Sequence, residues 1–161
     1  TSNRIVAVIE LGVNVMPNSP DGSASSAGPD RLNAAGEKGI PQIVTCGNAD
    51  FINFLDSETI PRKYRHRSLY FHNPQASAMR LNAREQKLLG RVIAEKLNKA
   101  VGPVEVIIPT RGFSSLSREG RIFCDPEADR AFIKALRGTL RKEIAVKEVA
   151  ANMMITSLLK W

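Results

Sequence analysis

Cysteine is scarce in this sequence of 161 residues: only Cys46 and Cys124 occur, far apart in the chain and without paired spacing. Such a pair argues against a disulfide framework and against a cysteine-rich zinc site, and we expect no metal site. Unpaired cysteines suit a reducing compartment, so we expect a cytoplasmic protein.

The sequence also lacks any apolar run close to the roughly 18 residues that a membrane span needs, so we expect no membrane partner. Two glycine-rich phosphate-binding patterns, G-x-x-x-x-G-K and G-x-G-x-x-G, are missing as well. Their absence removes the usual sequence grounds for nucleotide binding.

What is present is an ordinary globular composition with an uneven charge. Hydrophobic residues make up 43% and charged residues 24%, and the length suits one compact domain over 1–161. The net charge is +7, and the excess lies in the second half: residues 81–161 hold 15 Lys/Arg and 9 Asp/Glu, against 8 and 7 in residues 1–80. This balance favours an anionic partner, although basic surfaces also serve solubility alone.

Strand and helix patterns alternate along the chain. The strand patterns cover 4–9, 40–46, 67–73, 104–109 and 143–149, and the helix patterns cover about 30–38, 82–100, a segment from 125 onward and the terminal residues 153–161. Residues 17–28, rich in Pro, Gly and Ser, predict a flexible loop. We therefore expect an α/β fold, with a mostly parallel open sheet of about five strands and helices on both faces in three layers, like a Rossmann fold.

Polar residues follow three of the predicted strands, where ligands bind in open α/β sheets. These candidates are Gly47, Asn48, Asp50 and Asn53 after the second strand, His72 and Asn73 after the third, and Arg111, Gly112, Ser114 and Ser115 after the fourth. Each set has a plainer interpretation, because Asn, Asp and Gly also form turns. Their expected convergence at one edge of the sheet favours a ligand site.

Arg111 is the candidate anion clamp, since its guanidinium matches carboxylate and phosphate groups; the alternative is a salt bridge to a helix. Gly112 lets the backbone approach a ligand, and the serine hydroxyls either bind the anion or cap a turn. His72 is the candidate acid or base, with Asp50 to orient it, unless it is a structural residue. A Ser114–His72–Asp50 triad lacks the G-x-S-x-G pattern that would support it.

Two charged clusters have plain alternatives. The basic loop 62–67, "RKYRHR", suits a nucleic acid or a phosphate tail, but we favour a solvated loop and do not expect nucleic acid binding. Asp125, Glu127 and Asp129 look like metal ligands, but with Pro126 they better fit the acidic first turn of a helix.

Four stretches resemble the carboxy-terminal domain of the tobamovirus-resistance-like ATP-binding family, long catalogued as an uncharacterised protein family. They are "SAGPDRLNAAGEKGIPQIV" (26–44), "GNADFINF" (47–54), "LYFHNPQASAMR" (69–80) and "PTRGFSS" with "FCDPEADRAF" (109–132). The resemblance implies one half of a two-domain protein whose other, amino-terminal half is associated with ATP. We therefore expect no ATP binding by this chain alone, and the missing amino-terminal domain as a partner.

Two functions remain open. The first is a binding or catalytic half-domain that holds a small anionic metabolite at the strand ends, and the sequence does not decide whether it is an enzyme. The second is a non-enzymatic interaction or regulatory module for protein or nucleic acid. Homo-oligomerisation is compatible with either function.

Overall fold

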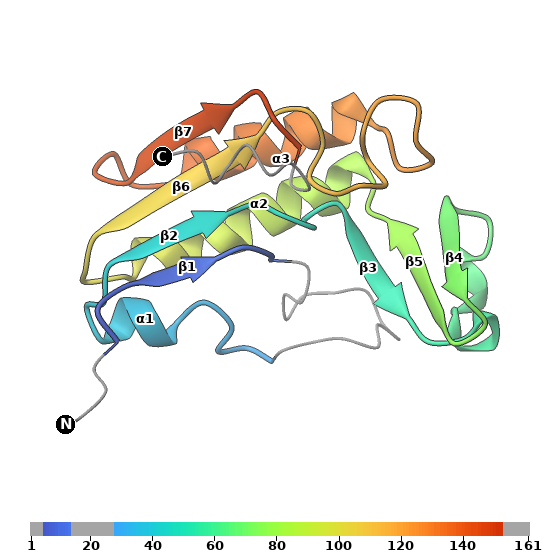
Figure 1. Ribbon diagram of the computed structural model, residues 1–161, viewed down its shortest axis with the longest axis horizontal. Coiled ribbons are helices and arrows are strands. Elements are labelled where there is room, and N and C mark those ends of the chain that lie inside the picture. The colour runs from blue at the N-terminus through green and yellow to red at the C-terminus, as the bar shows by residue number, and fades with distance from the viewer. Residues whose placement is uncertain (1–4, 14–27, 153–161) are drawn as a thin grey trace.

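The computed structural model describes residues 5–13 and 28–152. Its main sheet is parallel throughout and has the strand order β1-β2-β6-β7 (Figure 1). The strands are β1 (Val8–Glu10), β2 (Gln42–Thr45), β6 (Val104–Pro109) and β7 (Ala145–Val149). The apolar runs rich in β-branched residues therefore predicted the strands of this sheet, although β1 begins four residues later than we expected.

Three helices cover one face of this sheet: α1 (Ala34–Glu37), α2 (Ala83–Asn98) and α3 (Pro126–Thr139). The strands follow one another across the sheet in chain order, so right-handed connections place every helix on the same side. The hydrophobic core lies between them, where Val44, Val106 and Ile108 of the sheet meet Ile93, Leu97, Phe132 and Leu136 of the helices.

The opposite face of the sheet carries Ile9, which is 64% exposed. The described residues thus form two layers where we expected three. The predicted terminal helix over 153–161 lies outside the described residues, as does most of the predicted loop 17–28.

The longest helix, α2, follows from its sequence as predicted. The Asn82 side chain accepts a hydrogen bond from the Glu85 amide at 3.0 Å, and the Glu85 side chain accepts one from the Asn82 amide at 2.8 Å. This reciprocal capping box fixes the first turn. At Gly90, an added Cβ would lie 2.6 Å from the Phe132 carbonyl oxygen, so glycine permits the close packing of α2 against α3.

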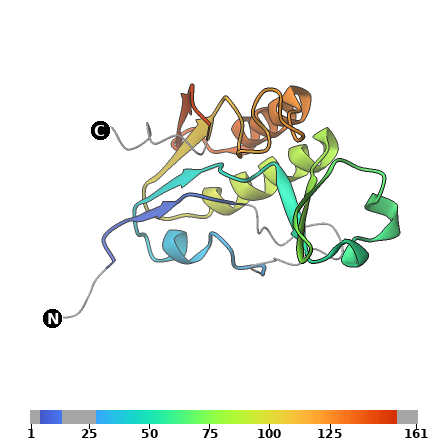
Figure 2. The same cartoon turned by 45° about the vertical axis from the view of Figure 1, so that its right-hand side comes forward.

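A second, antiparallel sheet with the order β3-β5-β4 is inserted between β2 and α2. Its strands are β3 (Phe51–Phe54), β4 (Leu69–Asn73) and β5 (Ala76–Arg80), and the 3-10 turns η1 (Ser57–Thr59) and η2 (Arg62–Tyr64) connect β3 to β4. Figure 2 shows this sheet at one end of the main sheet. The predicted strand 67–73 is therefore β4 of this small sheet. Sequence analysis did not predict β3 or β5.

The α/β class and the mostly parallel, Rossmann-like sheet are confirmed. Among the described residues, no helix combines the length and the apolar character that crossing a membrane requires.

Candidate functional site

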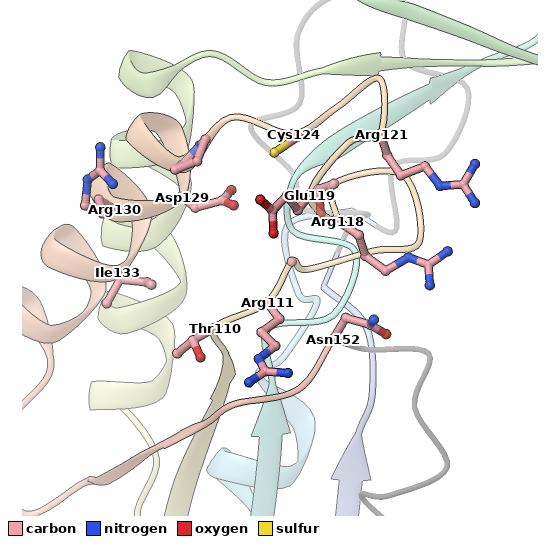
Figure 3. Close-up of a pocket in the computed structure, with 13 residues that line it drawn as sticks. Thr110, Arg111, Arg118, Glu119, Arg121, Cys124, Asp129, Arg130, Ile133 and Asn152 are labelled. Atoms are coloured by element: carbon pink, nitrogen blue, oxygen red, sulfur yellow. The ribbon is translucent and has the colours of Figure 1, made fainter.

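A cleft of about 1100 Å³ lies at the carboxyl ends of β6 and β7 (Figure 3). Its walls come from the segment after β6, the first turns of α3 and the chain after β7. The lining residues are Thr110, Arg111, Gly112, Ser117, Arg118, Glu119, Arg121, Cys124, Pro126, Asp129, Arg130, Ile133 and Asn152. The cleft thus lies at the edge of the sheet where open α/β folds bind their ligands.

Backbone hydrogen bonds hold the floor of the cleft. The amides of Thr110 and Arg111 donate to the carbonyls of Val149 and Ala151 at 2.9 and 3.0 Å, which ties the end of β6 to the end of β7. Gly112 turns the chain with a φ of +109°, which L side chains rarely adopt. An added Cβ there would also lie 3.1 Å from the Ser117 carbonyl, so glycine is required on two counts.

The far wall of the cleft, residues 114–124, is anchored to the second sheet. The buried ring of Phe123 packs against Phe51 of β3 at 6.2 Å and against Tyr70 of β4 at 6.5 Å between ring centroids. The Phe123 amide also donates to the Leu116 carbonyl at 2.9 Å. The small sheet therefore supports the wall of the cleft and supplies none of its lining residues.

Four arginines border the cleft: Arg111, Arg118, Arg121 and Arg130. None of them forms an ion pair with a carboxylate of the described residues. In Figure 3, Arg118 and Arg121 extend to one side of the opening, and Arg111 lies between Thr110 and Asn152. The rim therefore presents positive charge that the described part of the chain does not neutralise.

The middle of the cleft has a different character. The side chains of Glu119, Cys124 and Asp129 are turned toward one another (Figure 3). Within residues 5–13 and 28–152, no group of three or more His, Cys, Asp or Glu is placed to hold a metal ion. Cys124 is exposed, whereas Cys46 is buried in the core, where burial raises the pKa of its thiol to about 12.

Behind Asp129 lies a buried arginine between two carboxylates. Arg80, 5% exposed, donates from Nη2 to Asp129 Oδ1 at 2.5 Å and from Nη1 to the Asp50 backbone carbonyl at 2.9 Å. The same Nη1 lies 4.0 Å from Asp50 Oδ2. Ser114 Oγ donates to that oxygen at 2.6 Å.

Burial dominates the titration of both carboxyls. It raises the pKa of Asp50, and the Ser114 hydroxyl and Arg80 oppose that shift in part. Burial also raises the pKa of Asp129 to about 6, against the opposing charge of Arg80. The two acids therefore favour their protonated forms more than exposed carboxyls do.

The structure brings together several of the predicted site residues. Arg111 and Gly112 line the cleft, and Ser115 lies in its supporting loop. Ser114 and Asp50 are buried behind the cleft and bond each other. Gly47 and Asn48 contribute backbone only: the Asn48 amide donates to the Phe113 carbonyl at 2.7 Å, which joins the loops after β2 and β6.

The other predicted residues lie elsewhere, because β4 is not a strand of the main sheet. His72 and Asn73 are exposed at the β4–β5 turn, and Asn73 Oδ1 accepts a hydrogen bond from the Gln75 amide at 2.8 Å. Asn53 lies within β3. His72 does not bond Asp50: Asp50 Oδ2 accepts from Ser114, and Asp50 Oδ1 has no hydrogen-bond partner among the described residues. The Ser114–His72–Asp50 triad, which the sequence already disfavoured, does not form in the structure.

Both charged clusters make contacts within the domain. Arg67 pairs with Glu85 at 2.8 Å, and Arg65 donates to the Ile60 carbonyl at 3.0 Å, so the basic loop 62–67 uses part of its charge internally. Asp125 accepts from the Ala128 amide at 3.0 Å and caps α3, with Pro126 at the first helical position. Asp129 lies in the same acidic turn of α3, but its side chain pairs with Arg80.

Sequence analysis missed Arg80, Arg118 and Asp129 as residues of the site. Arg80 ends the segment "ASAMR", which was not predicted to be a strand, and its partner Asp129 is 49 positions away in the chain. Arg118 and Arg121 lie in a polar segment that also contains Gly120, and this composition is typical of an ordinary loop.

Comparison with known proteins identifies the class. Residues 1–156 match the C-terminal domain of the uncharacterised protein family UPF0261, and the chain belongs to this family. The chain is 37% identical over 153 residues to a UPF0261 protein of Clostridium tetani, covering 94% of this chain and 38% of that protein. It is 40% identical over 141 residues to one of Rhizobium meliloti, covering 88% and 35%.

A plant protein is related as well. The ToMV resistance protein Tm-1(GCR237) of Solanum lycopersicum is 35% identical over 133 residues, covering 83% of this chain and 18% of that protein. The chain therefore spans little more than a third of the length of its bacterial relatives and a smaller share of the plant protein.

Proposed function

We propose that this domain binds a small anionic metabolite in the cleft at the ends of β6 and β7. The observation that carries the proposal is the set of four rim arginines without a carboxylate partner among the described residues. A guanidinium offers several fixed donors to carboxylate or phosphate oxygens. Arginines that no described acid neutralises are therefore suited to an external anion.

The position of the cleft supports the same function. Rigid strands carry the backbone as far as Pro109, so the polar groups that follow are held in place. Gly112 opens space at the floor, and Arg111 is the rim residue nearest to it in the chain. The buried Ser114 supports this loop from behind through Asp50.

We further propose that this chain acts as the carboxyl-terminal domain of a longer protein. Ligands of α/β proteins commonly bind between domains, so an adjoining domain would close over the cleft and complete the site. Whether the complete site is catalytic depends on groups of both domains. A nucleic acid is a less suitable ligand, since two arginines of the basic loop bond within the domain.

Arg111 gives the test of this site. Isothermal titration calorimetry should detect binding of inorganic phosphate or a dicarboxylate to the wild type. Arg111→Lys keeps the charge and loses the paired donors, so it should weaken binding by about 1–3 kcal/mol. Arg111→Ala should weaken it at least as much while leaving the melting temperature nearly unchanged, because Arg111 is exposed.

Arg91→Ala is the matched control, because Arg91 is an exposed arginine on α2 that does not line the cleft. Its affinity for phosphate should equal that of the wild type. If Arg111→Ala unfolds the domain and the wild type binds no anion, Arg111 is a structural residue and the proposal fails.

A further inference from the structure

Asp50, Arg80 and Asp129 form a buried cluster with unequal numbers of acids and bases. One guanidinium lies 2.5 Å from an oxygen of Asp129 and 4.0 Å from an oxygen of Asp50. With all three groups ionised, the cluster carries one excess negative charge. An uncompensated charge away from water is unfavourable, so this composition favours protonation of one of the two acids.

The two acids differ in their access to the cleft. Asp50 is 0% exposed, and its Oδ1 has no hydrogen-bond partner among the described residues. Asp129 lines the cleft, and 19% of its side chain is exposed. Asp129 is therefore the member of the cluster at which a proton can pass between the cluster and the cleft.

We propose that Asp129 is the proton-exchanging residue of the anion site, so that the cleft takes up an oxyanion together with one proton. This inference rests on the proposed function, because it concerns the same cleft. While Asp129 is ionised, its charge and that of Glu119 opposite repel an entering anion (Figure 3). Once Asp129 is protonated, its hydroxyl donates to an oxygen of a carboxylate, sulfate or phosphate, and no bond within the ligand changes.

The surroundings of Asp129 place this proton uptake close to neutral pH. The charged and titratable groups around it are Arg80 of β5, Asp50 of the loop before β3, Asp125 at the start of α3, and Glu119 and Cys124 of the cleft wall. Burial raises the pKa of Asp129 to about 6, Asp50 and Asp125 act in the same direction, and Arg80 opposes them. Asp129 is thus mostly ionised at pH 7.5 before the anion binds.

Sulfate is the suitable probe, since its own charge is constant between pH 5 and 7.5. Calorimetric titrations of the wild-type chain, repeated in buffers of different ionisation enthalpy, count the protons taken up. If only the protonated form binds, the affinity for sulfate should be about 30-fold weaker at pH 7.5 than at pH 5. Nearly one proton should be taken up for each sulfate bound at pH 7.5.

Asp129→Asn replaces the ionisable acid with a neutral amide of the same shape. This variant should bind sulfate at pH 7.5 about as tightly as the wild type binds it at pH 5, without proton uptake. Glu127→Gln is the control, because Glu127 is an exposed acid in the same turn of α3 outside the cleft lining, and it should keep the wild-type pH profile.

Binding without proton uptake in the wild type overturns the inference and leaves the proposed function standing. So does a pH dependence that survives in Asp129→Asn, or one that Glu119→Gln removes instead. Absence of sulfate binding at every pH overturns the proposed function and this inference with it. If Asp129→Asn folds poorly because Arg80 has lost its charged partner, the number of protons that the wild type takes up for each sulfate bound still tests the inference.

Discussion

The Ser114 hydroxyl donates a 2.6 Å hydrogen bond to the Asp50 carboxylate, although the two residues lie 64 positions apart in the chain. Both side chains are buried, so the bond links the loop after β2 to the loop after β6 away from water. Asp50 in turn adjoins Arg80, which bonds Asp129 in the cleft. A continuous set of polar contacts therefore connects the two loops with the wall of the candidate site.

Ser114→Ala should destabilise the domain by about 1–3 kcal/mol, because it leaves a buried carboxyl without its hydrogen-bond donor. Denaturant unfolding at pH 7 measures this loss. Ser115→Ala is the control: Ser115 is half-buried, and its hydroxyl bonds no described residue. Equal stabilities of the two variants would show that the Ser114–Asp50 bond contributes little to folding.

The packing of α2 provides a second prediction. Ile93 is 0% exposed in the core, so Ile93→Asp buries an unpaired charge and should cost about 3–5 kcal/mol. Leu88, on the same helix, is 51% exposed, and Leu88→Asp should change the stability by no more than about 0.5 kcal/mol. Thermal melting of the pair separates burial from the helix propensity of aspartate, which both variants share.

The main sheet was predictable because its signals are local. The apolar run of β6, the capping box at Asn82 and the Asp125–Pro126 start of α3 each lie within a few residues of chain. Arg111 and Gly112 were predictable as site residues for the same reason, since they directly follow a buried strand.

The second sheet was not predictable in this way. Residues 67–73 were correctly predicted to form a strand, but the segment itself does not indicate which strand it pairs with. Its antiparallel pairing with β5 places His72 away from Asp50. The pairing of Arg80 with Asp129 depends on that same sheet. Contacts between distant segments thus decide which polar residues share the site.

ATP binding offers a third prediction. The chain lacks both glycine-rich phosphate-binding patterns, G-x-x-x-x-G-K and G-x-G-x-x-G, so we expect no ATP site in these residues. Calorimetric titration with ATP should show weak binding or none. Any residual binding through the triphosphate should disappear in Arg111→Ala; tight, saturable binding that survives this substitution would place a nucleotide site elsewhere in this chain.

Asp129 should also make the stability of the domain depend on pH. Its pKa in the folded protein, about 6, lies above the reference value of 3.8, because burial favours the protonated acid. Between these values the folded protein binds more protons than the unfolded chain, so the free energy of unfolding falls as the pH rises. The contribution is complete below about pH 4 and is lost as the pH rises through 6, a change of about 2–3 kcal/mol.

Denaturant unfolding at several pH values between 4 and 7 tests this dependence. Asp129→Asn cannot take up the proton, so its stability should vary less with pH than that of the wild type. Some dependence should remain, because burial raises the pKa of Asp50 in the same direction. Glu127→Gln should retain the full wild-type slope, since that acid is exposed. A slope in Asp129→Asn as steep as that of the wild type would mean that Asp129 is ionised in the folded protein throughout this range, and that Arg80 outweighs the effect of burial.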